Sequence, residues 1–138
     1  MSEIKVNNLT GKTSAGDITV TSEGGAATQS LQQGLAKVWI DHNQVTSHSI
    51  RDSLNISSIT DAGTGQTYPI AFSNNMSSSS YSGVMYSSAN TTTAYTSFNN
   101  AYTGGLGTKT TSSFGHASFG TGFIDALRND DVLYGDLA

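Results

Sequence analysis

The sequence has no cysteine, one proline and one tryptophan among its 138 residues. Without cysteine, the chain can be neither a disulfide-stapled miniprotein nor a holder of a thiolate zinc site. Only 12% of the residues are charged, the net charge is −4, and Lys and Arg form no cluster. Because nucleic-acid binding needs a basic surface, we expect no nucleic-acid partner.

Long hydrophobic runs are also missing. Hydrophobic residues make up 36% of the chain, and no run is long enough for a membrane-spanning helix, so we expect no membrane insertion. No apolar segment of the secretory type follows Met1, so we expect no secretory signal. The composition therefore indicates neither a membrane protein nor a highly charged disordered chain.

Hydroxyl residues and glycine take the place of charge. Ser and Thr together supply 39 residues, and Gly supplies 15. Thr favours strands, whereas Ser and Gly favour turns, and short strand-like runs recur at intervals of roughly 8–12 residues. This pattern predicts an all-β protein, with a short extended arm over residues 1–35 followed by a small antiparallel β-sandwich, jelly-roll-like, over residues 36–138.

Residues 36–65 contain three strand-like runs and two turn signals. In the run 37–43, Val38 and Ile40 share one face and Trp39 lies on the other. The run 47–52 is short and polar, and the run 53–60 places two apolar residues two positions apart before the Gly-rich turn 61–65. We expect a core that includes Trp39, Ile50, Leu54 and Ile56. A further strand over 67–72 contains Pro69, which cannot donate to a ladder, so we expect that strand to lie at a sheet edge or to begin at that residue.

The order of these elements (a Trp strand, an Arg-Asp-Ser step, then Ser-Ser-Ile-Thr-Asp before Gly-Thr-Gly) resembles the C-terminal domain of bacteriophage tail-fibre and virion appendage proteins of the marine-phage type. The first seven residues and the last six resemble the ends of the same proteins, whereas no motif of residues 74–131 aligns with them. The resemblance implies a structural virion protein of a tailed phage, made in the bacterial cytoplasm. It would be a short tail-fibre or appendage component that attaches to the host surface.

Partners follow from the resemblance and from the thin supply of apolar residues. Residues 1–35 hold too few apolar residues for a core, so we expect them to bind other virion proteins or to join subunits. A helical turn is expected near Leu31, and short strands near Ile4 and Val20. A hydroxyl-rich domain of this size favours a shared interface, and phage fibre tips are usually trimers, so we expect a homotrimer. The alternatives are a capsid decoration or head-fibre protein of the same fold and, less favoured, a glycan-degrading tail enzyme.

Catalysis is not expected. Ser47, His48, Ser49 and Asp52 contain the groups of a hydrolytic triad, but His48 and Asp52 would lie over ~13 Å apart along a strand. The chain also has no G-x-S-x-G elbow and no paired acids in a plausible groove. We expect no cofactor.

No metal site is expected either. His42, His48 and His116 lack ligand spacing, and we expect them to be exposed to solvent. The acidic run 125–131 lacks the order of a calcium loop, so it predicts a turn or a helix cap.

Two further predictions concern individual side chains. Arg51, one of only two arginines, and Asp52 are expected to be structural braces, with Asp41, Asp52 and Asp61 as candidate partners for the arginine. Among the aromatic residues on polar segments, Tyr81, Tyr95 and Tyr102 are the candidate receptor contacts, on a host glycan or protein. Alternation places Tyr86 and Phe98 in the core instead.

Overall fold

The computed structural model describes residues 3–14, 18–88, 109–119 and 122–138. The chain divides into two compact units, Met1–Leu35 and Ala36–Ala138. Within the described ranges, no helix is long and apolar enough to cross a membrane.

The first unit consists of a small hairpin and one helical turn. Strands β1 (Thr19–Thr21) and β2 (Thr28–Ser30) pair antiparallel, and helix α1 (Leu31–Gly34) follows directly. Ser30 caps the helix because its Oγ accepts a hydrogen bond from the backbone N–H of Gln33 at 3.4 Å. The helical turn and the strand around Val20 are confirmed, whereas the segment around Ile4 forms no strand.

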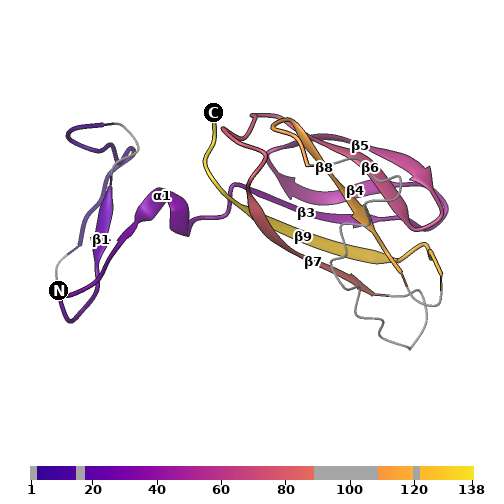
Figure 1. Cartoon of the computed structure of the whole chain (residues 1–138), viewed down its shortest axis with the longest axis horizontal. Helices are drawn as coiled ribbons and strands as arrows, with labels where there is room; N and C mark the ends of the chain where they lie inside the picture. Colours follow the sequence, from indigo (N-terminus) through magenta and orange to yellow (C-terminus); the bar gives the residue numbers. More distant parts are fainter. Residues whose placement is uncertain (1–2, 15–17, 89–108, 120–121) are drawn as a thin grey trace. The chain divides into compact units, whose positions relative to one another are not determined.

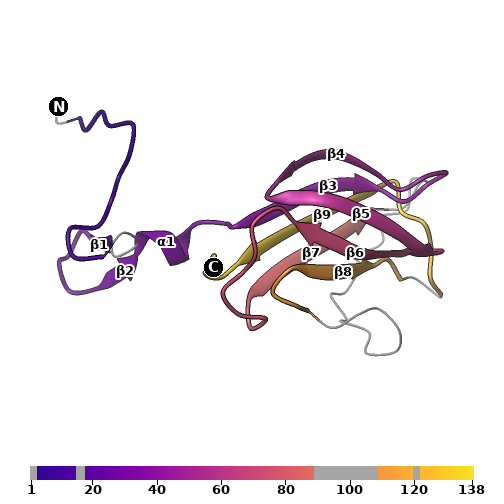
Figure 2. The same cartoon turned by 90° about the horizontal axis from the view of Figure 1, so that it is seen from above.

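The second unit is an antiparallel β-sandwich, which confirms the predicted fold class (Figure 1). One sheet has the order β4-β3-β9-β7, and the other has the order β5-β6-β8. In Figures 1 and 2 the strands of both sheets run in similar directions, as in an aligned sandwich. The strands are β3 (Val38–Asn43), β4 (Ser49–Leu54), β5 (Ile56–Gly63), β6 (Gln66–Phe72), β7 (Ser82–Ser88), β8 (Ser113–Ala117) and β9 (Arg128–Tyr134).

The interior of the sandwich is apolar at one end and polar at the other. In β3, alternate residues point inward, and Val38 and Ile40 are buried together as the period-2 pattern predicts. The next inward position is His42, which is also fully buried. The apolar cluster comprises Val38, Ile40, Ile70, Phe72, Met76, Tyr81, Phe114 and Leu133.

Three of the four predicted core residues are wrong. Trp39 is only half-buried, because it lies on the face of β3 opposite the apolar cluster. Ile50 and Leu54 lie on β4, whose side chains all face solvent or lie near it, and both are exposed. Ile56, in contrast, packs against the apolar cluster. The predicted strand 53–60 is in fact two strands, because Asn55 adopts a positive φ of 60° and carries the chain from one sheet to the other. Leu54 and Ile56 therefore belong to different sheets.

The prediction of an edge strand at Pro69 is also wrong. Strand β6 is the central strand of its sheet, between β5 and β8. Its pairing with β8 is irregular between Thr67 and Ile70, so the missing N–H of Pro69 falls where the ladder is already interrupted.

Candidate functional site

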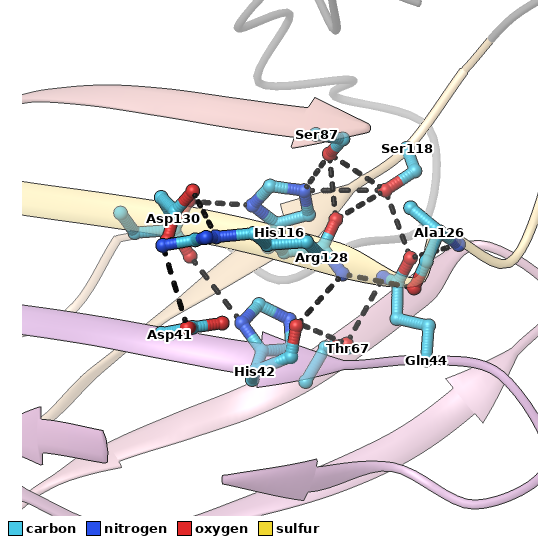
Figure 3. Close-up of polar contacts among 12 residues, drawn as sticks. Asp41, His42, Gln44, Thr67, Ser87, His116, Ser118, Ala126, Arg128 and Asp130 are labelled. Carbon is cyan, nitrogen blue, oxygen red and sulfur yellow. Dashed lines mark hydrogen bonds and ion pairs between the residues drawn. The ribbon is translucent and has the colours of Figure 1, made fainter. Parts of the chain in front are cut away.

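A cluster of buried polar side chains fills the end of the sandwich where β3 ends and β9 begins (Figure 3). The strand register assembles it, because His42 and Ser87 both pair with Asn129, and Thr67 pairs with His116 across the other sheet. We call it the polar cluster; its buried members are His42, Gln44, Thr67, Ser87, His116, Ser118, Asn129 and Asp131.

Three members of the polar cluster have the connectivity of a catalytic triad. Asp131 Oδ1 lies 2.6 Å from His116 Nδ1, and His116 Nε2 lies 2.7 Å from Ser87 Oγ. The three residues come from β9, β8 and β7, which are neighbours in space but far apart in sequence. An acid, a base and a hydroxyl connected in this order are the groups that a hydrolytic triad requires.

The direction of the hydrogen bonds can be deduced from Asn129. Its Nδ2 faces two backbone carbonyls, those of His42 at 3.3 Å and Ala126 at 3.4 Å, so this end of the amide must be the donor. Its Oδ1 then faces the two hydroxyls, Ser87 Oγ at 2.6 Å and Ser118 Oγ at 2.8 Å. A contact of 2.6 Å between two oxygens requires a hydrogen between them, so Ser87 donates to Asn129.

Gln44 is oriented in the same way by a backbone group. The Ala126 N–H donates to Gln44 Oε1 at 3.2 Å, and Ser118 Oγ donates to the same oxygen at 2.8 Å. Gln44 Nε2 then donates to Thr67 Oγ1 at 3.1 Å. Both amides of the polar cluster are therefore fixed by backbone groups at the ends of strands.

These directions leave His116 Nε2 as the donor toward Ser87. Because the single hydrogen of Ser87 is directed at Asn129, the 2.7 Å contact between Ser87 Oγ and His116 requires an N–H on the ring. A base that activates a serine must accept the hydroxyl hydrogen, which is the opposite arrangement. Ser87 is also only 3% exposed, so a substrate carbonyl could not reach its Oγ in this conformation. The contacts therefore fit a structural polar core.

The second ring of the polar cluster is held neutral. His42 packs edge-on against His116 with ring centroids 5.2 Å apart, and its Nε2 lies 3.2 Å from Thr67 Oγ1. Burial, aided by the nearby His116, His48 and Arg51, lowers the pKa of His42 from 6.5 to about 3. Burial likewise raises the pKa of Asp131, against the opposing effect of His116. The expectation that the histidines are exposed is wrong, because His48 too has a nearly buried side chain.

His48 links the polar cluster to the surface. Its Nδ1 lies 3.2 Å from Thr67 Oγ1, and its Nε2 lies 3.5 Å from the exposed carboxylate of Asp61. The ring of His48 thus contacts Thr67 and Asp61, and Asp52 bonds the N–H of Ser53 instead. Among the residues that the structure describes, no group of three or more His, Cys, Asp or Glu side chains is arranged to hold a metal ion.

The acidic run near the C-terminus does not form the predicted turn beyond residue 127. Strand β9 begins at Arg128, so Asp130 and Asp131 alternate between its two faces. Asp131 points inward to the histidines, and Asp130 points outward, where Arg128 Nε binds it at 3.0 Å. Asp131 therefore binds a buried partner, and the neighbouring Asp130 binds a partner at the surface.

The predicted braces lie on the outer face of the same sheet. Arg51 Nη1 binds Asp41 Oδ1 at 3.1 Å, and Arg51 Nη2 donates to the backbone oxygen of Leu127 at 2.6 Å. Arg51 therefore ties the edge strand β4 to β3 and to the residue before β9. Asp52 Oδ1 accepts a local bond from the N–H of Ser53 at 2.8 Å. Arg128 Nη2 also approaches Asp41 Oδ2, at 3.6 Å.

Of the three candidate receptor-contact residues, Tyr81 is wrong. It is 4% exposed, its hydroxyl donates to the backbone oxygen of Ser113 at 2.9 Å, and its ring packs edge-on against Phe72. Lys109 covers it further, with Nζ 5.0 Å from the ring centroid. Tyr95 and Tyr102 lie outside the described residues, as does Phe98. Tyr86, which was assigned to the core, is exposed instead.

The sequence alone carried little signal for the polar cluster. Each member is a single polar residue far from most of the others in sequence, and strand pairing together with the packing of the two sheets brings His42, His116 and Asp131 together. One sign was available: His42 continues the alternation of Val38 and Ile40, so the strand pattern itself places it inside.

Comparison with known proteins adds no family. No protein-family model matches the chain, and neither the curated proteins nor the solved structures gave a match.

Proposed function

We propose that this protein is a structural component of a tailed-phage virion, a short tail-fibre or appendage protein that attaches to the host surface and carries out no catalysis. The observation that carries the proposal is that the first unit leaves large apolar side chains exposed, whereas the second unit encloses its own interior. The resemblance of residues 36–65 to phage appendage domains gives the class of protein, and the sandwich is a fold that suits it.

The first unit has the properties of an attachment arm. None of its described residues is buried, and large apolar side chains remain exposed, led by Ile4 at 84%. Val6, Leu9, Val20 and Leu35 are also exposed. Apolar side chains in such a short unit gain stability when another surface covers them. Residues 1–35 would therefore bind other virion proteins or the equivalent residues of two further copies in a homotrimer.

The second unit has the properties of a rigid outward domain. It encloses its own apolar cluster and its own polar cluster. The triad-like contact of Asp131, His116 and Ser87 is closed from solvent and oriented away from hydrolysis. That geometry supports a proposal without serine-type hydrolysis.

The test is the position of the chain in intact particles. Antibodies against the second unit, applied to purified particles and viewed by electron microscopy, should label the tail. Labelling of the shell would replace the tail-fibre proposal with the decoration or head-fibre alternative, and absence from the particle would reject both. The mass of the purified protein in solution tests the trimer separately, since a monomer at micromolar concentration would contradict it.

A further inference from the structure

The outer face of the β4-β3-β9-β7 sheet has an ordered arrangement of side chains. The register aligns Leu54, Trp39, Val132 and Val84 in one row that crosses all four strands. The next row along the strands holds Asp52, Asp41, Asp130 and Tyr86. An apolar band therefore lies directly beside a charged band, and Tyr134 and Ser82 pair in the row on the other side of the apolar band. We call these three rows together the outer face.

Several side chains of the outer face are open to solvent. Val84 is 67% exposed, and Tyr86 and Tyr134 are each 41% exposed. Trp39 is half-buried between Leu54 and Val132, its partners across the sheet. Contiguous apolar surface of this kind, bordered by polar groups, marks a binding site more often than chance exposure.

Three aromatic residues are spread over this face. From the spacing of strands and residues in a sheet, the Cα atoms of Trp39 and Tyr134 lie ~8 Å apart and those of Trp39 and Tyr86 ~12 Å apart. Rings at this spacing cannot form one compact pocket. They can each contact a successive ring of an elongated ligand, because an aromatic ring offers an apolar face and tyrosine adds a hydroxyl.

The charges of the outer face indicate a neutral ligand. Three carboxylates, those of Asp41, Asp52 and Asp130, outnumber the two guanidinium groups. Both arginines already bind carboxylates: Arg51 binds Asp41 at 3.1 Å, and Arg128 binds Asp130 at 3.0 Å. A polyanion would therefore meet net negative charge, whereas a ligand rich in hydroxyls could donate to the carboxylates and accept from the arginines.

A second copy of the chain fits the outer face less well. Four strands ~4.8 Å apart and seven residues ~3.3 Å long give a flat area of roughly 440 Å². A stable protein interface takes about 800 Å² from each partner, so this face alone supplies about half of what is needed. A small elongated molecule needs far less area, because its own surface is small.

We propose that the outer face binds a neutral oligosaccharide, with Trp39, Tyr86 and Tyr134 in contact with its sugar rings and Asp41 and Asp130 accepting hydrogen bonds from its hydroxyls. The inference rests on the proposed function, since it names the class of host molecule and the surface that meets it. It also moves the contact away from Tyr81, which is buried.

The single tryptophan makes the test direct, because Trp39 is the only one in the chain. Full-length protein is screened against arrayed neutral oligosaccharides of glucose, galactose, mannose, rhamnose and N-acetylhexosamine, and the best binder is titrated while tryptophan emission is followed. Binding should change the emission saturably and protect Trp39 from acrylamide quenching. Tyr86→Ala and Tyr134→Ala should each weaken binding by roughly tenfold, the value of one aromatic contact.

Phe119→Ala is the matched control, since Phe119 is an exposed ring that lies outside this sheet, and it should leave the affinity unchanged. If no neutral glycan binds, or if Tyr86→Ala binds as the parent does, the proposal is overturned. A second measurement, of whether the protein blocks adsorption of the phage to its host, distinguishes failure of the outer-face proposal from failure of the proposed function. Protein that blocks adsorption without binding glycan keeps the proposed function and rejects the outer face. Protein that binds glycan through Tyr86 without blocking adsorption keeps the outer face and rejects the proposed function.

Discussion

Asp131 Oδ2 and His42 Nδ1 lie 3.9 Å apart inside the sandwich, and neither atom has a hydrogen-bond partner among the residues that the structure describes. The other oxygen of Asp131 is bound to His116 at 2.6 Å. One carboxylate therefore faces two imidazole rings, of which it binds one and leaves the other neutral. Because these groups can bind protons, the stability of the fold depends on pH. Their burial keeps substrates from reaching them.

The first prediction is a loss of stability in acid that depends on His42. The pKa of His42 is about 3 in the folded chain and 6.5 when exposed, so between these values the unfolded chain binds more protons. The contribution of His42 is therefore complete above pH 6.5 and falls as the pH approaches 3, by at most ~1.4 kcal/mol per pH unit. The raised pKa of Asp131 acts in the opposite sense above its ordinary value of 3.8.

Urea unfolding across this pH window checks the prediction. The variant His42→Gln removes the titrating ring, and its free energy of unfolding should change less steeply with pH between 6.5 and 3 than that of the parent chain. Because the comparison is between slopes, a general loss of stability in the variant does not affect it. Equal slopes would show that His42 does not titrate as its burial requires.

The second prediction concerns Asn129, whose amide joins the two halves of the polar cluster. The change Asn129→Ala removes three hydrogen bonds and leaves buried donors and acceptors without partners, so it should lower the free energy of unfolding by about 2–5 kcal/mol. Chemical denaturation measures the loss. Asn75→Ala is the control: Asn75 is exposed and bonds Ala138 only through its backbone oxygen, so the change should stay within about 0.5 kcal/mol.

The fold class could be predicted from the sequence alone, whereas the polar cluster could not. The all-β class, the sandwich and the inward positions of Val38 and Ile40 follow from alternation and turn residues, which are local properties. The polar cluster follows from register within each sheet and from the packing of the two sheets, which places His116 of β8 against Asp131 of β9. No local pattern contains that information, and the chemistry of histidine and asparagine favours a prediction of exposure.

The errors in the predicted core and at Tyr81 have different physical origins. Leu54 and Ile56 satisfy the spacing of one strand face, but Asn55 between them takes up the left-handed conformation that asparagine tolerates better than most residues. Tyr81, in turn, lies between serines and resembles a surface residue, yet its ring packs against Phe72 and Lys109 covers it. The backbone conformation of Asn55 therefore separates Leu54 from Ile56, whereas tertiary contacts bury Tyr81.

The third prediction is that Tyr81 stabilises the fold and takes no part in recognition. Tyr81→Phe removes the bond to the Ser113 carbonyl and should lower the free energy of unfolding by about 1 kcal/mol, because that acceptor is buried. Tyr134→Phe is the control, since its ring is exposed, and it should change stability little. Burial raises the pKa of Tyr81 from 10.0 to about 12, so an ultraviolet titration of the parent chain should contain a phenol that ionises near pH 12 and that Tyr81→Phe removes.

The fourth prediction concerns Gly65, in the turn between β5 and β6. Its φ is +67°, and a Cβ there would lie 2.6 Å from the Ile124 backbone nitrogen and 2.7 Å from the Ser118 oxygen. Gly65→Ala therefore combines an unfavourable backbone conformation with a clash against backbone atoms, and it should cost about 2 kcal/mol or more. Thermal unfolding measures the effect. Gly122→Ala, where a Cβ would meet nothing within 4 Å, should be close to neutral.

The central claim is that this chain attaches a phage particle to its host. The most direct test incubates host cells with the purified full-length protein and then measures the rate at which the phage adsorbs. We predict that adsorption slows as the protein concentration rises and that the protein itself is retained on the cells. Unchanged adsorption at concentrations that saturate the cell surface, or no retention on the cells, would contradict the account.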